Sequence, residues 1–174
     1  MADIPDRIVL KRDRDLEGRR HAVYGRRGGV LLLAAFLVAG LLGVFGQRPG
    51  TSLAASPQAT LELFAPAHLR GGLLYEARFT IRARRPLKHA VLVLSPGWAE
   101  SQQINTIEPS PLGETSSDGR LALLLGHIDA GSTYRLFMQF QVNPTNVGRR
   151  AADVALYDGS RRLLHLDRTV TVFP

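Results

Sequence analysis

Histidine and aspartate occur twice at a spacing that could bind a metal ion. His127 and Asp129 form one His-x-Asp pair, and His165 and Asp167 form the other. On a strand, each pair would point to one face, and imidazole and carboxylate are both metal ligands. However, the first pair falls in an expected turn and Asp167 in a strand bend. We therefore expect both pairs to be solvated surface groups, with no metal and no cofactor.

Motifs of known catalytic sites are missing from the sequence. It has no Gly-x-Ser-x-Gly, no phosphate loop, no EF-hand loop and no His-Glu-x-x-His. Glu108 and Glu114 could mimic a glycosidase pair, but many surface loops offer two acids. The absence of cysteine excludes disulfides, a lipoprotein anchor and thiol catalysis. We expect a protein that is not an enzyme and has no small-molecule substrate.

The net charge of +7 raises the question of nucleic-acid binding. Residues 1–29 hold eight basic residues against five acids, whereas residues 57–174 hold 13 against 10. The excess is therefore concentrated in the N-terminal tail and spread thinly elsewhere, which argues against a nucleic-acid-binding face.

The uncharged stretch from Gly28 to Gly46 predicts one transmembrane helix. Its 19 residues would span about 28 Å as a helix, close to the thickness of a bilayer's hydrocarbon core. Eleven large apolar residues favour insertion by roughly 3–6 kcal/mol in total. These expected membrane-anchor residues are Val30, Leu31, Leu32, Leu33, Phe36, Leu37, Val38, Leu41, Leu42, Val44 and Phe45.

Basic residues before this helix predict its orientation. Eight of them precede it, including Arg19, Arg20, Arg26 and Arg27, and only Arg48 follows closely. The positive-inside rule then places residues 1–27 in the cytoplasm and the C-terminal part outside the plasma membrane. A cleaved signal peptide is the alternative, although the apolar run is long and the nearby small-x-small site is poor.

Small residues recur along the expected helix at intervals of four. Ala35, Ala39 and Gly43 would form a stripe on which a second helix could pack closely. Alanine and glycine are common in this chain, so a chance stripe is the competing explanation.

The part after the helix reads as a flexible linker, 47–58, followed by an all-β domain, 59–174. The linker is rich in small residues, and apolar and polar residues alternate from Leu61 onward, most clearly over 75–82. Asp118-Gly119 and Asp158-Gly159 predict tight turns. We expect an antiparallel immunoglobulin-like β-sandwich of about seven or eight strands, at 60–65, 73–84, 89–95, 102–108, 120–125, 133–142, 149–157 and 162–173.

The order of these features resembles a known family. A long alternating strand (75–84) precedes the segment VLVLSPGW (91–98), and the turn GHIDAGS (126–132) introduces another long strand. This is similar to the bacterial "conserved repeat" immunoglobulin-like surface domains. The overall layout also resembles an uncharacterised family of actinobacterial single-pass membrane proteins. The resemblance implies an all-β stalk, adhesion or assembly module of the cell envelope.

Some expected strands are apolar on both faces, most clearly 91–94 and 121–125. Leu156, Leu163 and Phe137 also fall where we expect an outward face. Either a partner or second copy covers that face, or the loop 96–119 or the linker covers it. Trp98 and Phe137 are the expected contacts if a partner does, although Trp98 is also placed to pack on the sandwich.

These features favour a membrane-anchored, non-enzymatic extracytoplasmic interaction or assembly module. Its partner would be another membrane or envelope protein, or a second copy. The alternative is a secreted or wall-facing domain for adhesion or carbohydrate binding, released by signal-peptide cleavage. A transmembrane signalling protein is a third class, which would require the tail to bind a cytoplasmic factor.

Overall fold

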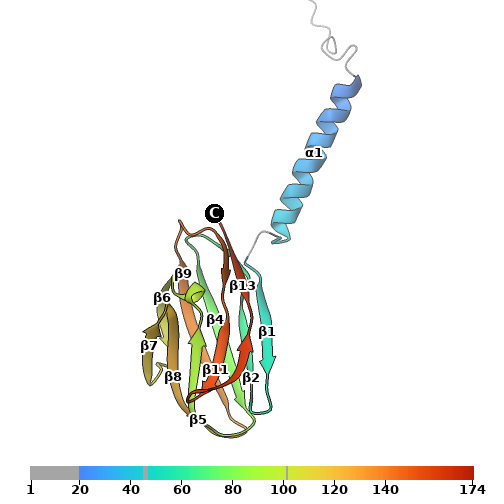
Figure 1. Ribbon diagram of the computed structural model, residues 1–174. Coiled ribbons are helices and arrows are strands. Elements are labelled where there is room, and N and C mark those ends of the chain that lie inside the picture. Colours follow the sequence, from blue (N-terminus) through green and yellow to red (C-terminus); the bar gives the residue numbers. More distant parts are fainter. Residues whose placement is uncertain (1–19, 45–46, 101) are drawn as a thin grey trace, which may run out of the picture. The chain divides into compact units, whose positions relative to one another are not determined.

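The chain divides into a helical unit up to Phe45 and a β unit from Gly46 onward. The computed structural model describes residues 20–44, 47–100 and 102–174, and Figure 1 draws both units. The β unit is a sandwich of antiparallel sheets, as the sequence predicts.

Helix α1 runs from Arg20 to Leu41, which is about 33 Å at 1.5 Å per residue. The segment His21–Leu41 is long and apolar enough to cross a membrane. The helix begins before the predicted start at Gly28 and ends before the predicted end at Gly46. Gly43 ends it by taking a left-handed φ of +66°. The amides of Gly43 and Val44 then donate to the carbonyls of Gly40 (2.9 Å) and Ala39 (3.0 Å), which is a Schellman motif.

Two five-stranded sheets form the layers of the sandwich (Figure 1). The first sheet has the order β1 (Pro49–Ala55), β2 (Ala59–Pro66), β4 (Leu74–Ala83), β9 (Thr133–Val142), β6 (Gln102–Glu108). The second has the order β12 (Arg161–Leu166), β11 (Val154–Asp158), β5 (Leu87–Leu94), β8 (Arg120–Ile128), β7 (Gly113–Ser117). A small third sheet contains β10 (Gly148–Ala151), β13 (Thr169–Phe173) and β3 (His68–Arg70), and β13 and β3 are parallel.

The core follows the period-two pattern. On β4 the predicted inward residues Tyr75, Ala77, Phe79 and Ile81 are all buried. Leu156, which we expected on an outward face, is instead fully buried in the core. A β-bulge between Leu156 and Tyr157 shifts the pairing of β11 with β12 at this point.

The segment 47–58, predicted to be a flexible linker, is largely a strand. Strand β1 pairs with β2 over seven residues, from Pro49↔Pro66 to Ala55↔Thr60. Its small, weakly β-forming residues hide it from sequence patterns, and pairing with a neighbouring strand overrides that weak preference. Strands β3 and β7 were missed for similar reasons, because one is three residues long and the other, GETSS, lacks large apolar residues.

Both predicted tight turns join antiparallel hairpins. Asp118 and Gly119, between β7 and β8, have φ of +52° and +71°, the positive pair that a type I′ turn needs. The other two-residue loop is Gly159-Ser160, one residue beyond the predicted Asp158-Gly159. Gly159 has a φ of +58° there.

A 3₁₀ turn, η2 (Pro96–Trp98), follows β5 and approaches β10 too closely for any side chain at Gly97. A Cβ on Gly97 would lie 2.0 Å from the carbonyl oxygen of Ala151. We expect Gly97→Ala to destabilise the fold by about 1–3 kcal/mol, because backbone must move to admit the methyl group. Gly50→Ala is the matched control, since a Cβ there meets nothing within 4 Å.

Trp98, the chain's single tryptophan, lets fluorescence follow unfolding of the sandwich in both variants. Equal unfolding midpoints for Gly97→Ala and Gly50→Ala would contradict the close approach of Gly97 to the carbonyl of Ala151.

Candidate functional site

Trp98, predicted as a possible surface contact, is fully buried, so that expectation is wrong. The turn η2 folds the indole into the end of the sandwich, where its ring centroid lies 5.6 Å from Phe79 and 5.3 Å from Phe140. This is the packed arrangement that the sequence also allowed. Trp98 therefore belongs to the core.

Phe137, the other predicted contact, lies on the outer face of the first sheet and is 36% exposed. Its cross-strand neighbour Arg78 places a guanidinium 5.6 Å from the Phe137 ring and 5.1 Å from the Phe64 ring. These cation–π contacts stabilise the exposed ring within the chain itself, so its exposure does not require a partner protein. This face mixes charged and apolar groups: outward positions hold Glu62, Glu76, Arg82, Arg135 and Gln139, but also Leu53 (67% exposed) and Leu74 (52% exposed).

The outer face of the second sheet is apolar at the centre of its three middle strands, between Arg120 on β8 near one end and Lys88 on β5 near the other. Residues pointing away from the core on β11, β5 and β8 form what we call the apolar face: Val91, Val93, Ala122, Leu124, Ala155 and Tyr157. Leu124 is 40% exposed. These are the doubly apolar strands that the sequence singled out.

The segment 96–119 does not cover the apolar face. Its β6 extends the edge of the first sheet, and its β7 extends the edge of the second. Leu112, between them, donates its amide to the carbonyl of Leu124 (2.8 Å) and remains 80% exposed. The two strands of this segment therefore extend the sheet edges, and Leu124 stays 40% exposed.

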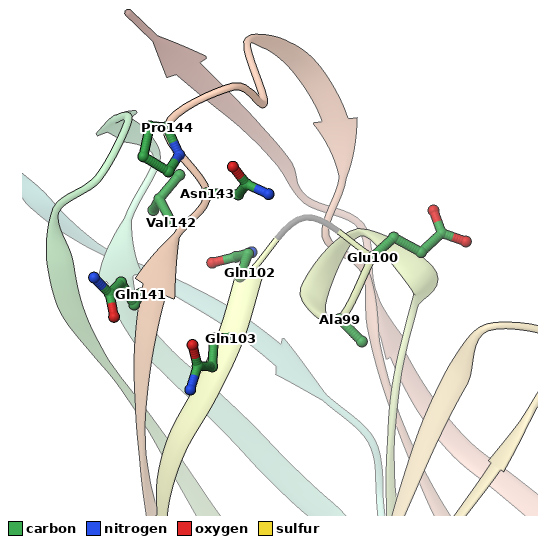
Figure 2. Close-up of a pocket in the computed structure, with 8 residues that line it drawn as sticks. All are labelled: Ala99, Glu100, Gln102, Gln103, Gln141, Val142, Asn143 and Pro144. Atoms are coloured by element: carbon green, nitrogen blue, oxygen red, sulfur yellow. The ribbon is translucent and has the colours of Figure 1, made fainter.

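A polar groove of about 470 Å³ opens near Trp98 at the end of the sandwich (Figure 2). Its walls come from the turn after η2, the start of β6 and the end of β9 with the loop that follows. They are Ala99, Glu100, Gln102, Gln103, Gln141, Val142, Asn143 and Pro144. The lining is rich in amides, and the amide of Gln102 is already engaged, because its Nε2 donates to the carbonyl of Gly97 (3.0 Å).

Beneath this groove lies a buried polar cluster. The hydroxyl of Tyr75 donates to Oε1 of Gln102. Burial raises the pKa of Tyr75 well above its ordinary value of 10.0, and the hydrogen bond to Gln102 and the charge of Arg168 oppose this only in part. Burial also lowers the pKa of Arg168, whose guanidinium lies 5.8 Å from the Trp98 ring.

The same end of the sandwich brings together three potential metal ligands. Asp153, His165 and Asp167 each offer one donor atom, and these atoms all lie within 4.8 Å of one another. Nε2 of His165 is 3.0 Å from Oδ1 of Asp167. The spacing in the sequence indicates the His165–Asp167 pair but not Asp153, which is twelve residues from His165. Asp153 lies close to the pair because β11 and β12 are paired in the sheet.

Apart from Phe45, the predicted membrane-anchor side chains belong to α1 or to the turn after it, and they are exposed. Ala35 and Ala39 lie within α1, but Gly43 lies beyond its end. Only two of the three residues of the predicted small-residue stripe are therefore on the helix. Arg20 begins the helix, and Arg26 and Arg27 lie within it. Phe45 and Arg19 fall outside the described residues, as does most of the tail 1–27.

Comparisons with known proteins show similarity of fold only. No family model and no curated protein matches the chain. Among solved structures, CaCohA2 from Clostridium acetobutylicum is 13% identical with a TM-score of 0.44, covering 67% of this chain and 92% of its own. A non-cellulosomal cohesin from Archaeoglobus fulgidus is 12% identical with a TM-score of 0.41, covering 71% and 91% respectively.

A third similar structure is a much larger protein. The exo β-N-acetylglucosaminidase of Vibrio harveyi is 12% identical with a TM-score of 0.34, and this chain matches 18% of its length. Such low identities and TM-scores carry no argument about activity or partner. The resemblance to conserved-repeat surface domains stays a prediction.

Tyr75 gives the sandwich a dependence on alkaline pH. A phenol that stays protonated in the folded chain but ionises when unfolded stabilises the fold fully below about pH 10, and this contribution is lost as pH rises further. We expect the free energy of unfolding to fall above about pH 10. Tyr75→Phe should remove that component and cost about 1–2 kcal/mol at neutral pH by stranding Gln102. Unfolding midpoints of the native chain and of Tyr75→Phe, read from Trp98 fluorescence across pH, measure the alkaline loss of stability and the cost of the substitution. If the variant loses stability above about pH 10 as steeply as the native chain, Tyr75 is not the source of the pH dependence.

Proposed function

We propose that this protein is a membrane-anchored, non-enzymatic interaction module of the cell envelope, which binds a protein partner through the apolar face of its second sheet. The observation that carries the proposal is the contrast between the two outer faces. On the first sheet charged side chains such as Glu62, Glu76 and Arg135 lie among the apolar ones, whereas the centre of the second sheet is an apolar patch of Val91, Val93, Leu124 and their neighbours.

An apolar patch at the centre of a sheet face suits a protein partner. The cores of protein interfaces are depleted in charge, and a polar rim surrounds them. Here the rim is supplied by the edge strands, with Arg162 and His165 on β12 and Thr115 on β7. Leu124 is a large apolar side chain left 40% exposed within this face, which supports a covering partner.

The short connection between helix and sandwich supports a partner at the same membrane. Val44 is the last described residue of the helix's C-terminal turn, and Pro49 begins β1. The chain between them can span at most about 17 Å at roughly 3.5 Å per residue. If α1 crosses the bilayer with its basic end in the cytoplasm, the sandwich is held at the outer surface. Another membrane or envelope protein, or a second copy, is then within reach.

Membrane anchoring is tested directly on the full chain expressed in bacteria. Because the uncharged stretch that starts at Gly28 partitions into lipid, we expect the protein to stay in the membrane pellet after an alkaline carbonate wash, with Met1 intact. Release as a soluble fragment beginning near Gln47 would refute anchoring and support the secreted alternative. Leu37→Arg, which places a charge at mid-helix, should shift the chain out of the pellet.

Single cysteines test the apolar face, since the native chain has none. We expect Ala122→Cys, on the apolar face, to crosslink a partner in intact membranes through a thiol-reactive photo-crosslinker. Gln139→Cys, outward on the first sheet, is the matched control and should give no adduct. A disulfide-linked dimer from Ala122→Cys would identify a second copy as the partner.

Substitutions that place a charge on either sheet face test the same interface by its loss of partner binding. Leu124→Lys should weaken binding at least about tenfold, since it buries a charge in the interface core. Phe137→Lys changes a side chain of similar exposure on the opposite sheet and should leave binding unchanged. Loss of binding with Phe137→Lys but not with Leu124→Lys would move the interface to the first sheet.

A further inference from the structure

We propose that Asp153, His165 and Asp167 form a binding site for one divalent transition-metal ion, for which Zn²⁺ is the best match. The inference does not rest on the proposed function, because it concerns ion binding by this chain alone. Asp153 precedes β11, His165 lies on β12, and Asp167 follows β12, so the β11–β12 pairing brings the three side chains to one end of the sandwich.

The donor atoms are close to the spacing that a metal requires. Around a tetrahedral zinc ion with bonds of about 2.1 Å, neighbouring ligand atoms lie roughly 3.4 Å apart. Nε2 of His165 and Oδ1 of Asp167 are 3.0 Å apart, and the three donor atoms all lie within 4.8 Å of one another. His165 and Asp167 have side chains that are 37% and 89% exposed, so small rotations can close the remaining gap.

Asp153 is the fixed member of the set. Its Oδ1 accepts a hydrogen bond from the backbone amide of Arg168 (2.9 Å), and its carbonyl accepts one from the amide of Ser95 (3.0 Å). Hydrogen bonds to a ligating carboxylate are the usual support for a metal site, because they orient the ligand before the ion arrives. Asp153 is only partly exposed, unlike the other two ligands.

The donor types select the class of ion. An imidazole nitrogen favours zinc and its transition-metal neighbours, whereas Ca²⁺ and Mg²⁺ prefer sites made of oxygen ligands alone. Two carboxylates neutralise the ion's charge, and the ion removes the repulsion between them. Three protein ligands leave a fourth position open to water or another ligand, as in many zinc sites.

The second His-x-Asp pair is a control built into the chain. Nε2 of His127 is also 3.0 Å from Oδ1 of Asp129, and both side chains are exposed. Strand register places this pair at the opposite end of the sandwich, since Leu94 pairs with Leu121 and Leu87 with Ile128. Within the described residues, no third ligand joins it in a metal-binding group.

Zinc titration of the full chain in detergent tests the site. The protein carries no polyhistidine tag and is first freed of metal with a chelator. We expect isothermal titration with ZnCl₂ to show one saturable equivalent, and Co²⁺ to give the visible absorption of a low-symmetry complex with one nitrogen ligand. His165→Ala should weaken Zn²⁺ binding by at least about tenfold.

Two further variants separate ligation from folding. Asp153→Asn keeps an oxygen that can accept from the Arg168 amide while removing the charge, so it should fold normally and bind Zn²⁺ at least about tenfold more weakly. His127→Ala should bind like the native chain. The proposal is overturned if the native chain shows no saturable Zn²⁺ binding, if His165→Ala binds equally well, or if His127→Ala loses as much affinity as His165→Ala.

Discussion

The buried guanidinium of Arg168 constrains one whole end of the sandwich. Its Nη2 donates to the carbonyls of Ala65 (2.8 Å) and Pro66 (2.7 Å), at the C-terminal end of β2. A buried cation is costly unless its hydrogen bonds are satisfied. Here Nη2 has two carbonyl partners and the guanidinium lies 5.8 Å from the Trp98 ring, while the buried Nη1 has no hydrogen-bond partner among the described residues. The chain must therefore bring β2, η2 and the β12–β13 turn to one place.

The backbone of Arg168 extends the same constraint to Asp153. Its amide donates to the Asp153 carboxylate, and its carbonyl accepts from the amide of Ala152 (2.7 Å). These two hydrogen bonds join the turn between β12 and β13 to the turn between β10 and β11. Asp167, next to Arg168 in sequence, is thereby held near Asp153. The backbone of Arg168 therefore helps to hold two ligands of the proposed metal site together.

Sequence patterns predicted what depends on neighbours along the chain and missed what depends on neighbours in space. Alternation on β4 and the glycines of two hairpin turns are local signals, and the structure bears them out. Strand β1 has little intrinsic preference and exists because β2 offers it an edge. The burial of Trp98 and the approach of Asp153 to His165 likewise depend on contacts between turns that are far apart in sequence.

The apolar face and the proposed metal site share one surface, and a single register determines both. His165, Ala155, Val93, Ala122 and Thr115 form one outward row across the second sheet. A slip of one residue in β11 would turn Ala155 inward and carry Val154 and Leu156 out of the core. The core residues Leu92, Val154 and Leu156 therefore specify the outer surface as strictly as they specify the inner one. Core packing on the opposite side of the same strands holds the apolar face in place. A chain without disulfides can therefore present such a face to solvent.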